Sequence, residues 1–550
     1  MEKIEITVNG DIKEYTEDIT GFRLIEDYNQ KNIICIKVNG KYVMPDVRIN
    51  KSANIEFISY ANTYGNRIYV NGLKFILIMA TKKILGNDAN PIFCSSIDKG
   101  IFVKIKSNTT VDKEKLIEIK KEMLNIIKSD YHFESLGVIK KDLASYYTKT
   151  KQFEKARNLN NSIGNYANIN KCDKYYGYFY GKLPLSTSYI EKFDFTFIQD
   201  NTLVLRFPVP RGDFEVPPYT YRKKIVDIIN NYENWGEKLK VSFVGDINEI
   251  ISNGTIKEFI MINELNQNKR LAQISDTIKE NKDTKKIILI AGPSSSGKTT
   301  TSNKLCVYLK ELGLNPHLIS TDDYFLNLSE TPKNDKGEYD FESIHSIDLN
   351  LFNTDISNLL SGIEVEIPTF NFKKGEKEYL GKKISLKEND ILLIEGLHAL
   401  NEELTQSINR NNKYKIYVSP FTPLSVDTYN YISATDSRLI RRIIRDHRTR
   451  GFNIENTLKQ WENVRAGEEK YVFPFQDEAD MAFNTAFIYE IGVIKVYIEP
   501  LLNTIIEDSP YYEDAKRLKK LISSFLPIPS EYIPKDSILR EFIGGSSFYD

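Results

Sequence analysis

Hydrophobic and polar residues follow different patterns in the two halves of the chain. Over residues 1–62, short β-branched runs such as Ile4–Val8 stop at turns such as Asn9-Gly10, around one helical stretch. This pattern predicts a small module built mainly of strands. Over residues 63–212, stretches with helical spacing, such as 111–128, are mixed with extended ones, which predicts an α+β unit.

The second half contains short, wholly apolar runs, such as residues 287–291 and 391–394, separated by stretches with helical spacing. Runs of this kind are typical of buried parallel strands that helices connect. We therefore expect an α/β fold with a parallel sheet over residues 284–500. Residues 213–283 predict a helical connector before this domain, and residues 501–550 a helical extension after it.

Composition and charge exclude several classes of protein. The 74 basic and 75 acidic side chains give a net charge of -1, so the chain as a whole does not attract nucleic acid or an anionic membrane. The four cysteines form no CxxC pair, which argues against a disulfide framework or a zinc ribbon. All apolar runs are much shorter than the roughly 20 residues of a membrane-spanning helix. We expect a cytoplasmic protein without membrane contact.

A phosphate-binding motif, GxxxxGK[ST], follows the apolar run that ends at residue 291. The candidate ATP-binding residues are Gly292, Pro293, Ser294, Ser295, Ser296, Gly297, Lys298, Thr299 and Thr300. In such a loop the backbone N–H groups point at phosphate oxygens, Lys298 reaches the β- and γ-phosphates, and the Thr299 hydroxyl binds Mg²⁺. The alternative is an ordinary glycine-rich turn between a strand and a helix. The motif predicts ATP as phosphate donor and Mg²⁺ as cofactor.

Acidic residues follow two further strand-like runs. Asp322 comes after residues 317–320, and Glu395 comes directly after residues 391–394. Since the carboxyl ends of parallel strands meet at one edge of a sheet, both acids are expected near the phosphate loop. We predict that Asp322 is the general base and a metal neighbour, and that Glu395 holds Mg²⁺ directly or through water. A turn-forming or helix-capping Asp and a solvated Glu are the alternatives.

Arginines cluster in a helix-like stretch, residues 436–451. Its apolar residues repeat at i,i+4 spacing, while Arg438, Arg442 and Arg445 lie on an adjacent face. Arginines beside a nucleotide can clamp the γ-phosphate and stabilise the charge of the transition state. A solvated charged face and a nucleic-acid contact are the alternatives.

Taken together, these motifs resemble the uridine kinase family of P-loop nucleoside kinases, which is related to phosphoribulokinases and pantothenate kinases. The resemblance covers residues 287–495 and implies transfer of the γ-phosphate of ATP to the 5′-hydroxyl of a ribonucleoside. It implies that Asp322 and Lys298 are catalytic, with Arg442 and Arg445 as the arginines of a closing lid. The positions that correspond to substrate-binding residues of the family are Asp322, Tyr324, Glu342, Phe370, Arg442, Arg450 and Gln460.

The chain departs from the family around the nucleoside base. Phe370 and Gly375 stand where members carry a tyrosine and a histidine, and Phe452 stands where an arginine is frequent. These changes remove hydrogen-bonding groups, so a preference for pyrimidines does not follow from the resemblance. An acceptor of another kind, a sugar phosphate or a pantothenate-like alcohol, therefore stays open.

The N-terminal half resembles part of threonyl-tRNA synthetases. Residues 1–62 are similar to their TGS domain, a β-grasp fold, and residues 63–212 to their second, editing-type domain. In that family a helix carries HxxxH, whereas residues 75–82 here contain no histidine, so the resemblance implies a scaffold without metal or hydrolytic chemistry. A regulatory ATPase whose N-terminal half contacts tRNA is the remaining alternative.

Overall fold

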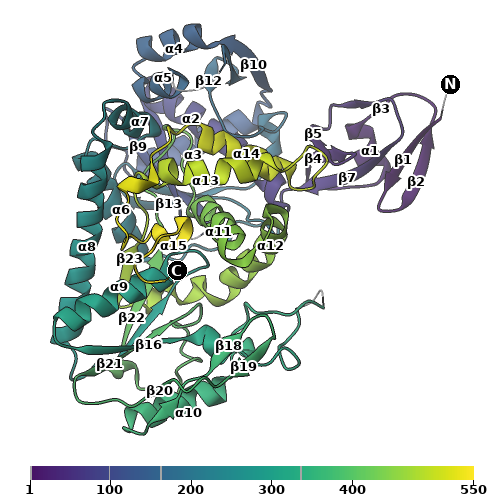
Figure 1. The fold of residues 1–550 in the computed structure, drawn as a ribbon. Coiled ribbons are helices and arrows are strands. Elements are labelled where there is room, and N and C mark those ends of the chain that lie inside the picture. The colour runs from purple at the N-terminus through teal and green to yellow at the C-terminus, as the bar shows by residue number, and fades with distance from the viewer. Residues whose placement is uncertain (1–2, 98, 161–163, 335–336, 550) are drawn as a thin grey trace.

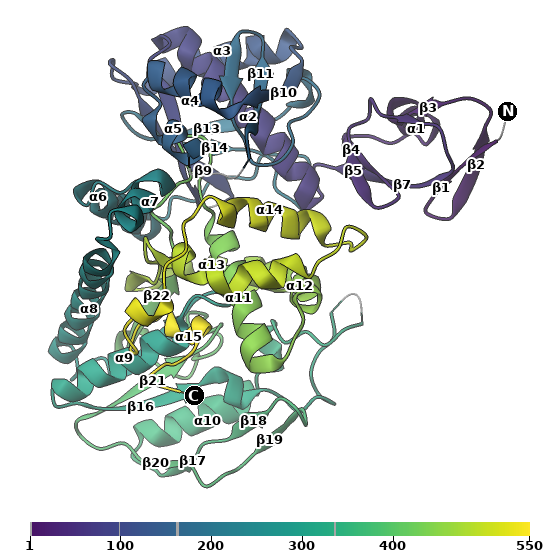
Figure 2. The same ribbon diagram turned by 45° about the horizontal axis from the view of Figure 1, so that its top comes forward.

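The computed structural model describes residues 3–97, 99–160, 164–334 and 337–549. A small N-terminal module extends away from a larger body, to which the long helix α2 connects it (Figures 1 and 2). The body consists of a second α+β unit and a C-terminal α/β half, with helices between them (Figure 1). Within the described residues, no helix has the length and apolar character that crossing a bilayer requires.

The N-terminal module consists of a five-stranded mixed sheet, a two-stranded sheet and a helix, with a core of its own. Its elements are β1 (Ile4–Val8), β2 (Asp11–Tyr15), β3 (Ile19–Thr20), α1 (Gly21–Asp27), β4 (Ile33–Val38), β5 (Lys41–Val43), β6 (Arg48–Ile49) and β7 (Ala53–Ser59). The sheet order is β2-β1-β7-β4-β5, and β1 pairs in parallel with β7 at its centre. Ile6, Leu24 and Ile36 are fully buried between the sheet and α1.

The second unit is built around α2, whose middle turns are almost completely buried. Its elements are α2 (Thr63–Leu85), β8 (Asn90–Ile97), β9 (Gly100–Lys106), α3 (Lys113–Lys128), β10 (Phe133–Ile139), α4 (Lys140–Lys149), α5 (Phe153–Asn160), β11 (Tyr166–Cys172), β12 (Tyr175–Gly177), β13 (Asp194–Gln199) and β14 (Thr202–Arg206). An antiparallel sheet, β13-β14-β9-β8, and a smaller one, β10-β11-β12, pack around these helices. The unit is therefore α+β, as the mixed periodicity predicts.

Three helices connect this unit to the C-terminal half. They are α6 (Lys223–Lys238), α7 (Val244–Ser252) and α8 (Ile256–Glu280). They also pack on the second half: α8 contacts the helix that follows the phosphate loop, and the Tyr232 hydroxyl donates to the carbonyl of Asn484. The region expected to be a connector is thus part of the wall of the α/β half.

The C-terminal half contains a five-stranded, wholly parallel sheet, which confirms the expected α/β fold. Its order is β16-β21-β15-β22-β23, formed by β15 (Ile287–Ala291), β16 (Asn315–Ser320), β21 (Asp390–Glu395), β22 (Lys413–Ser419) and β23 (Met481–Asn484). Buried side chains cover both faces of this sheet. Ser320 and Ile290 are both in register with Glu395, so three strands end at the same level.

Helices and small hairpins surround this sheet. They include α9 (Lys298–Glu311), α10 (Leu349–Leu360), β17 (Val365–Glu366), β18 (Thr369–Asn371), β19 (Glu376–Glu378), β20 (Lys383–Ile384), α11 (Ala434–Arg450), α12 (Ile454–Tyr471), α13 (Glu490–Asn503), α14 (Tyr512–Ser523) and α15 (Arg540–Ile543). The boundary expected at residue 500 falls inside α13, and buried residues such as Phe542 belong to the same core as α8 and α11. The last fifty residues are therefore integrated into the α/β half.

Two arginines of α11 are buried in ion pairs that hold the fold together. Arg438 forms a two-pronged pair with Glu468, and Arg441 donates to Glu490 at 2.5 and 2.6 Å. Both arginines are at most 2% exposed. Arg438, which the sequence pattern groups with the phosphate-facing arginines, thus has a structural partner.

We expect Arg441→Ala to lower the free energy of unfolding by about 3–5 kcal/mol, because the substitution leaves the carboxylate of Glu490 buried without a counterion. Chemical denaturation checks this value. Arg410→Ala is the matched control: Arg410 pairs with Asp480 while it is 38% exposed, and its loss is expected to cost under about 1 kcal/mol. Equal effects of the two substitutions would contradict this interpretation.

Candidate functional site

The backbone of the loop after β15 requires glycine at two positions. A Cβ atom on Gly292 would lie 2.0 Å from the carbonyl oxygen of Val418, so no larger residue fits there. Gly297 has a φ of +86°, in the left-handed region that favours glycine, and it precedes the first residue of α9. The two glycines of the motif therefore let the loop turn tightly between strand and helix.

The loop presents donors that anionic groups already use. The N–H of Ser294 donates to Glu468 at 2.9 Å, and the N–H of Thr300 donates to Glu541 at 3.1 Å. The hydroxyls of Ser295 and Ser296 are buried and have no hydrogen-bond partner among the residues that the structure describes. A curved loop with N–H donors at the start of a helix is a binding site for an anion.

Two acids lie beside this loop. Glu395 is 9% exposed, and burial raises the pKa of its carboxyl to about 7, with the charge of Asp322 adding to the shift and Lys298 opposing it. The surrounding protein also raises the pKa of Asp322, although its side chain remains open to solvent, and the charges of Lys298 and Arg450 counteract this. A Cβ on Gly396 would lie 1.8 Å from the Thr321 hydroxyl, so this glycine allows the two strand ends to approach closely.

The two carboxylates fit a magnesium ion. Mg²⁺ usually binds one or two carboxylates together with substrate phosphates and water, so it needs no cluster of several acidic side chains. In the described part of the chain no group of three or more His, Cys, Asp and Glu side chains could hold a metal. The buried carboxyl of Glu395 resists ionisation without a cation, and the Thr299 side chain, one residue after Lys298, is exposed. Glu395, Asp322 and Thr299 are therefore suitable donors.

Three arginines of α11 share one fully buried carboxylate. Asp446 lies within 3.1 Å of Arg442, 2.9 Å of Arg445 and 3.4 Å of Arg450. Burial and the neighbouring Arg445 lower the pKa of Arg450 to about 10. Three guanidinium groups around one carboxylate leave an excess of positive charge, which favours an anionic ligand.

Arg442 connects this cluster to the phosphate loop. Its guanidinium donates to the Ser294 hydroxyl at 2.8 Å and to the Gln460 side chain at 3.4 Å. Glu342 belongs to the same region: burial and the charge of Glu468 raise the pKa of its carboxyl to about 7, and Arg442 opposes the shift. The structure thus brings together Arg442, Gln460 and Glu342, which are far apart in sequence.

Two residues that the sequence predicts as substrate contacts, Tyr324 and Phe370, lie mainly in the protein interior. Tyr324 is completely buried, its hydroxyl donates to Asp355 at 3.1 Å, and its ring packs against Phe352, so it is part of the core and not of the substrate site. Phe370 is 5% exposed and packs edge-on against Phe325 and Phe372. Phe370 therefore contributes to an aromatic cluster and offers the site little exposed surface.

His398 is a residue of this region that the motifs did not single out. It is 2% exposed, and the backbone of Glu342 lies beside its ring. Burial lowers the pKa of its imidazole to about 4, so the ring is neutral near pH 7, and its edge meets the ring of Tyr471. The sequence feature that could have identified His398 is its position three residues after Glu395, because the end of that strand is expected to face the nucleotide.

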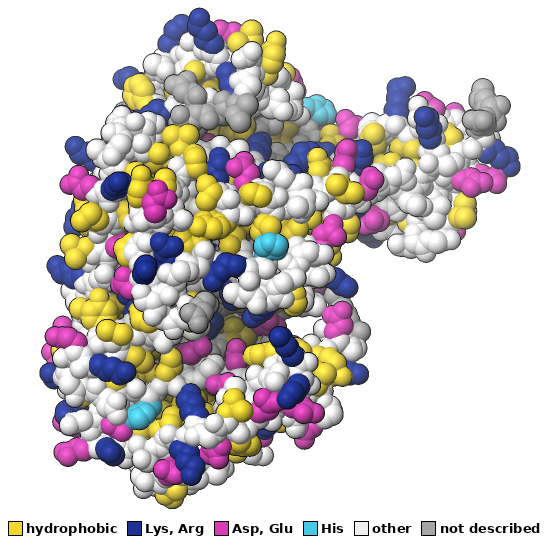
Figure 3. All heavy atoms as spheres, viewed as in Figure 1, with side chains coloured by type: hydrophobic (Ala, Val, Ile, Leu, Met, Phe, Trp, Pro, Cys, Tyr) yellow, Lys and Arg dark blue, Asp and Glu magenta, His cyan; other side chains and the backbone are white. Residues whose placement is uncertain are grey.

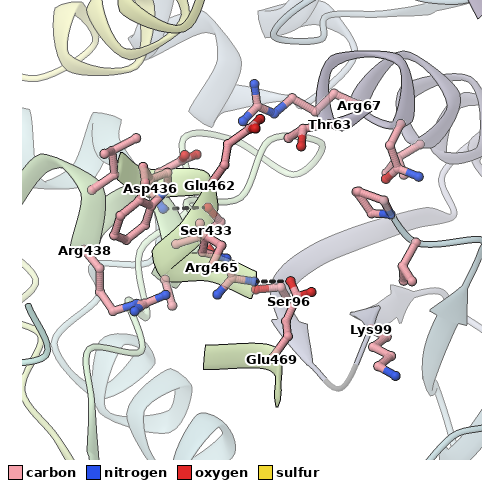
Figure 4. Close-up of a pocket in the computed structure, with 18 of the residues that line it drawn as sticks. Thr63, Arg67, Ser96, Lys99, Ser433, Asp436, Arg438, Glu462, Arg465 and Glu469 are labelled. Carbon is pink, nitrogen blue, oxygen red and sulfur yellow. Dashed lines mark hydrogen bonds and ion pairs between the residues drawn. The ribbon is translucent and has the colours of Figure 1, made fainter. Parts of the chain in front are cut away.

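A cavity of about 780 Å³ lies behind the phosphate loop, between the second unit and the α/β half. Arg67 of α2 and Asp436, Arg438 and Arg465 of α11 and α12 line it (Figure 4). Its charges are largely paired, as in the ion pair between Arg67 and Asp514 at 3.0 Å. Arg438 and Arg465 both bind Glu468, which in turn accepts a hydrogen bond from the loop, and Pro293 of the loop lines the cavity, so the cavity borders the loop.

A central parallel strand that ends in this loop, with acids at the ends of the next two strands on one side of it, defines a P-loop nucleotide-binding domain. Residues 287–488 match the model of the Phosphoribulokinase / Uridine kinase family. The chain therefore carries, over these residues, a P-loop kinase domain of this family, as its motifs predict.

Curated relatives agree with this assignment. Uridine-cytidine kinase B of Dictyostelium discoideum is 28% identical over 196 residues, which are 36% of this chain and 72% of that protein. A uridine kinase of Staphylococcus haemolyticus is 27% identical over 220 residues, 40% of this chain and 94% of that one. A solved structure described as a possible uridine kinase from Bacillus stearothermophilus has a TM-score of 0.27 and 17% identity, and the match covers 39% of this chain and 98% of that one.

Proposed function

We propose that this protein is an ATP-dependent kinase that phosphorylates the 5′-hydroxyl of a ribonucleoside. The observation that carries the proposal is the meeting of three groups at one end of the sheet: the phosphate loop, the acids Asp322 and Glu395, and the arginine cluster of α11. The relatives that match this domain are named as kinases of uridine and cytidine, which favours a nucleoside as the acceptor.

On the donor side, residues 292–300 hold the triphosphate of ATP through backbone N–H groups, and Lys298 neutralises its terminal phosphates. Thr299 and Glu395, with Asp322 nearby, would hold Mg²⁺, which would supply positive charge to the bound phosphates. In the structure Lys298 donates to the carbonyl of Pro293 at 3.4 Å, a weak contact that a phosphate oxygen readily replaces.

On the acceptor side, Asp322 accepts the proton of the attacking hydroxyl, and its raised pKa makes it a better base than an ordinary aspartate. Glu342 and Gln460 orient the sugar from the side of Arg442. Arg442 and Arg445 stabilise the charge on the transferred phosphoryl group, and Arg450, which is 48% exposed, closes the cluster toward solvent. Arg442 and Arg445 close over the phosphates as a lid, which excludes water from the reaction.

Surface charge does not favour RNA as the ligand of this protein. The net charge is -1, and the face shown in Figure 3 mixes Lys and Arg with Asp and Glu. Proteins that bind nucleic acid through its phosphates usually carry a basic patch or stripe. The resemblance of the N-terminal half to synthetase modules remains a prediction about its fold and not about its partner.

A panel of acceptors tests the proposal. The purified full-length protein is incubated with Mg²⁺-ATP and, in separate reactions, uridine, cytidine, adenosine, guanosine, a pentose phosphate and pantothenate. Release of ADP and formation of a nucleoside 5′-monophosphate with one or more nucleosides is the expected result. Phosphorylation of only the pentose phosphate or pantothenate would show that the acceptor is not a nucleoside, while the protein would still be an ATP-dependent kinase.

The binding of Mg²⁺ is expected to depend on pH. With a pKa of about 7, the Glu395 carboxyl is mostly protonated at pH 6 and mostly ionised at pH 8, and only the ionised form binds the metal. The affinity for Mg²⁺, measured with a bound ATP analogue, should therefore be about tenfold higher at pH 8 than at pH 6. In Glu395→Gln the affinity should be low and the pH dependence much reduced. The same tenfold dependence in that variant would exclude Glu395 as its source.

A further inference from the structure

The C-terminal segment, residues 537–549, lies against the start of α9. The carboxylate of Glu541 accepts hydrogen bonds from the backbone N–H of Thr300 at 3.1 Å and from its hydroxyl at 2.7 Å. The Tyr549 hydroxyl also contacts the Thr300 hydroxyl. In Figures 1 and 2 this segment and the chain end lie beside α9. A side chain from the end of the chain therefore occupies donors of the phosphate-binding motif.

Those donors are the ones that a nucleotide needs. In a phosphate-binding loop, the N–H groups at the start of the following helix cradle the phosphates, and the helix dipole adds to their attraction for negative charge. A carboxylate presents the same kind of oxygen as a phosphate. The negative charge of Glu541 also acts on Glu395 at the end of β21, so it lies within the electrostatic reach of the catalytic centre.

The segment is held in place by contacts that do not involve the loop donors. Ile538, Leu539 and Phe542 are completely buried, and Arg448 of α11 donates to the carbonyl of Phe542 at 2.6 Å. By contrast, Glu541 is only partly buried. The chain then passes through Gly544 and Gly545, both with a positive φ, to residues that are partly or fully exposed. The Glu541 side chain and residues 544–549 can thus move while Ile538, Leu539 and Phe542 stay in the core.

We propose that the Glu541 side chain and residues 544–549 form an autoinhibitory plug, in which Glu541 takes the place of a nucleotide phosphate and must leave before ATP is fully bound. This inference rests on the proposed function, because it requires ATP to bind at the loop. Arg448, which holds the segment, belongs to the same helix as Arg442 and Arg445. The segment is thus attached to the helix that carries the arginine cluster.

The Glu541→Gln substitution tests the plug, because it removes the charge of the side chain and hardly changes its shape. The amide keeps an acceptor for Thr300 but loses the charge that competes with phosphate, so we expect affinity for a non-hydrolysable ATP analogue with Mg²⁺ to rise roughly three- to thirtyfold. Glu531→Gln is the matched control, because Glu531 is an exposed carboxylate of the preceding turn. The affinity of this variant for the ATP analogue should equal that of the wild type. Calorimetry provides the dissociation constants.

Hydrogen exchange on the wild-type protein supplies a second measurement. Binding of the analogue should speed exchange of the peptide that covers residues 544–549 and leave the peptides of α13 unchanged. Equal affinities of wild type and Glu541→Gln, weaker binding by the variant, or slower exchange of the segment would each overturn the plug while nucleotide binding stands. Absence of nucleotide binding in both proteins would overturn the proposed function and the plug with it.

Discussion

Asp322→Asn is expected to lower turnover by about 10²–10⁴-fold and to leave the affinity for ATP nearly unchanged. The substitution keeps the size of the side chain but removes the group that accepts the proton of the attacking hydroxyl. The charges of Lys298, Arg445 and Arg450 act on this carboxylate, which places it where phosphates are bound. Steady-state assays with the best acceptor of the panel give turnover, and calorimetry gives the affinity for ATP.

The neighbouring acid provides the control for this prediction. Asp323 is partly buried and accepts a long hydrogen bond of 3.4 Å from the backbone N–H of Phe370, a structural contact. Asp323→Asn should therefore retain turnover within a few-fold of the wild type. Full turnover in Asp322→Asn would remove Asp322 from the mechanism, whatever the control shows.

Arg442→Gln should reduce turnover by about 10²–10³-fold, the usual effect of removing a charge-stabilising donor from a transition state. In the structure the guanidinium of Arg442 reaches the Ser294 hydroxyl, so it can follow the phosphates that the loop binds. Glutamine retains hydrogen-bonding capacity at this position but carries no charge. Rapid-quench measurement of a single turnover separates this effect on chemistry from an effect on product release.

Two comparisons keep this result interpretable. Arg410→Gln changes an arginine just before the start of β22 that binds Asp480, and the turnover of this variant should remain that of the wild type. Arg441→Ala, by contrast, should affect stability first, since Arg441 is buried against Glu490. An Arg442→Gln variant with unchanged turnover and unchanged stability would show that the arginine has no part in catalysis.

The sequence predicted the parts of the site that follow local rules. The motif from Gly292 to Thr299, the acids at the ends of β16 and β21, and the arginines of α11 all depend on strand ends or on helical spacing. Because the sheet is parallel, strand ends that are distant in sequence meet at one edge, and this made the position of Glu395 next to the loop predictable.

The sequence did not reveal groups that reach the site from far along the chain. Glu468 and Glu541 bind loop N–H groups from 174 and 241 residues away, and neither lies in a motif of the loop. For Tyr324 the sequence predicted a substrate contact that the structure does not show. It lies two residues after Asp322, but the short helical turn directs its side chain toward Asp355 in the core. Such outcomes depend on packing between elements, which local patterns do not encode.

The proposed phosphoryl transfer requires that the loop around Lys298 binds a nucleoside triphosphate together with magnesium. Calorimetric titration of the full-length protein with ATP, in the presence and absence of Mg²⁺, tests it most directly. We predict saturable binding that needs Mg²⁺ and is lost in Lys298→Ala. If neither the wild type nor Glu541→Gln showed magnesium-dependent affinity for any nucleoside triphosphate, this loop would not be a nucleotide-binding site.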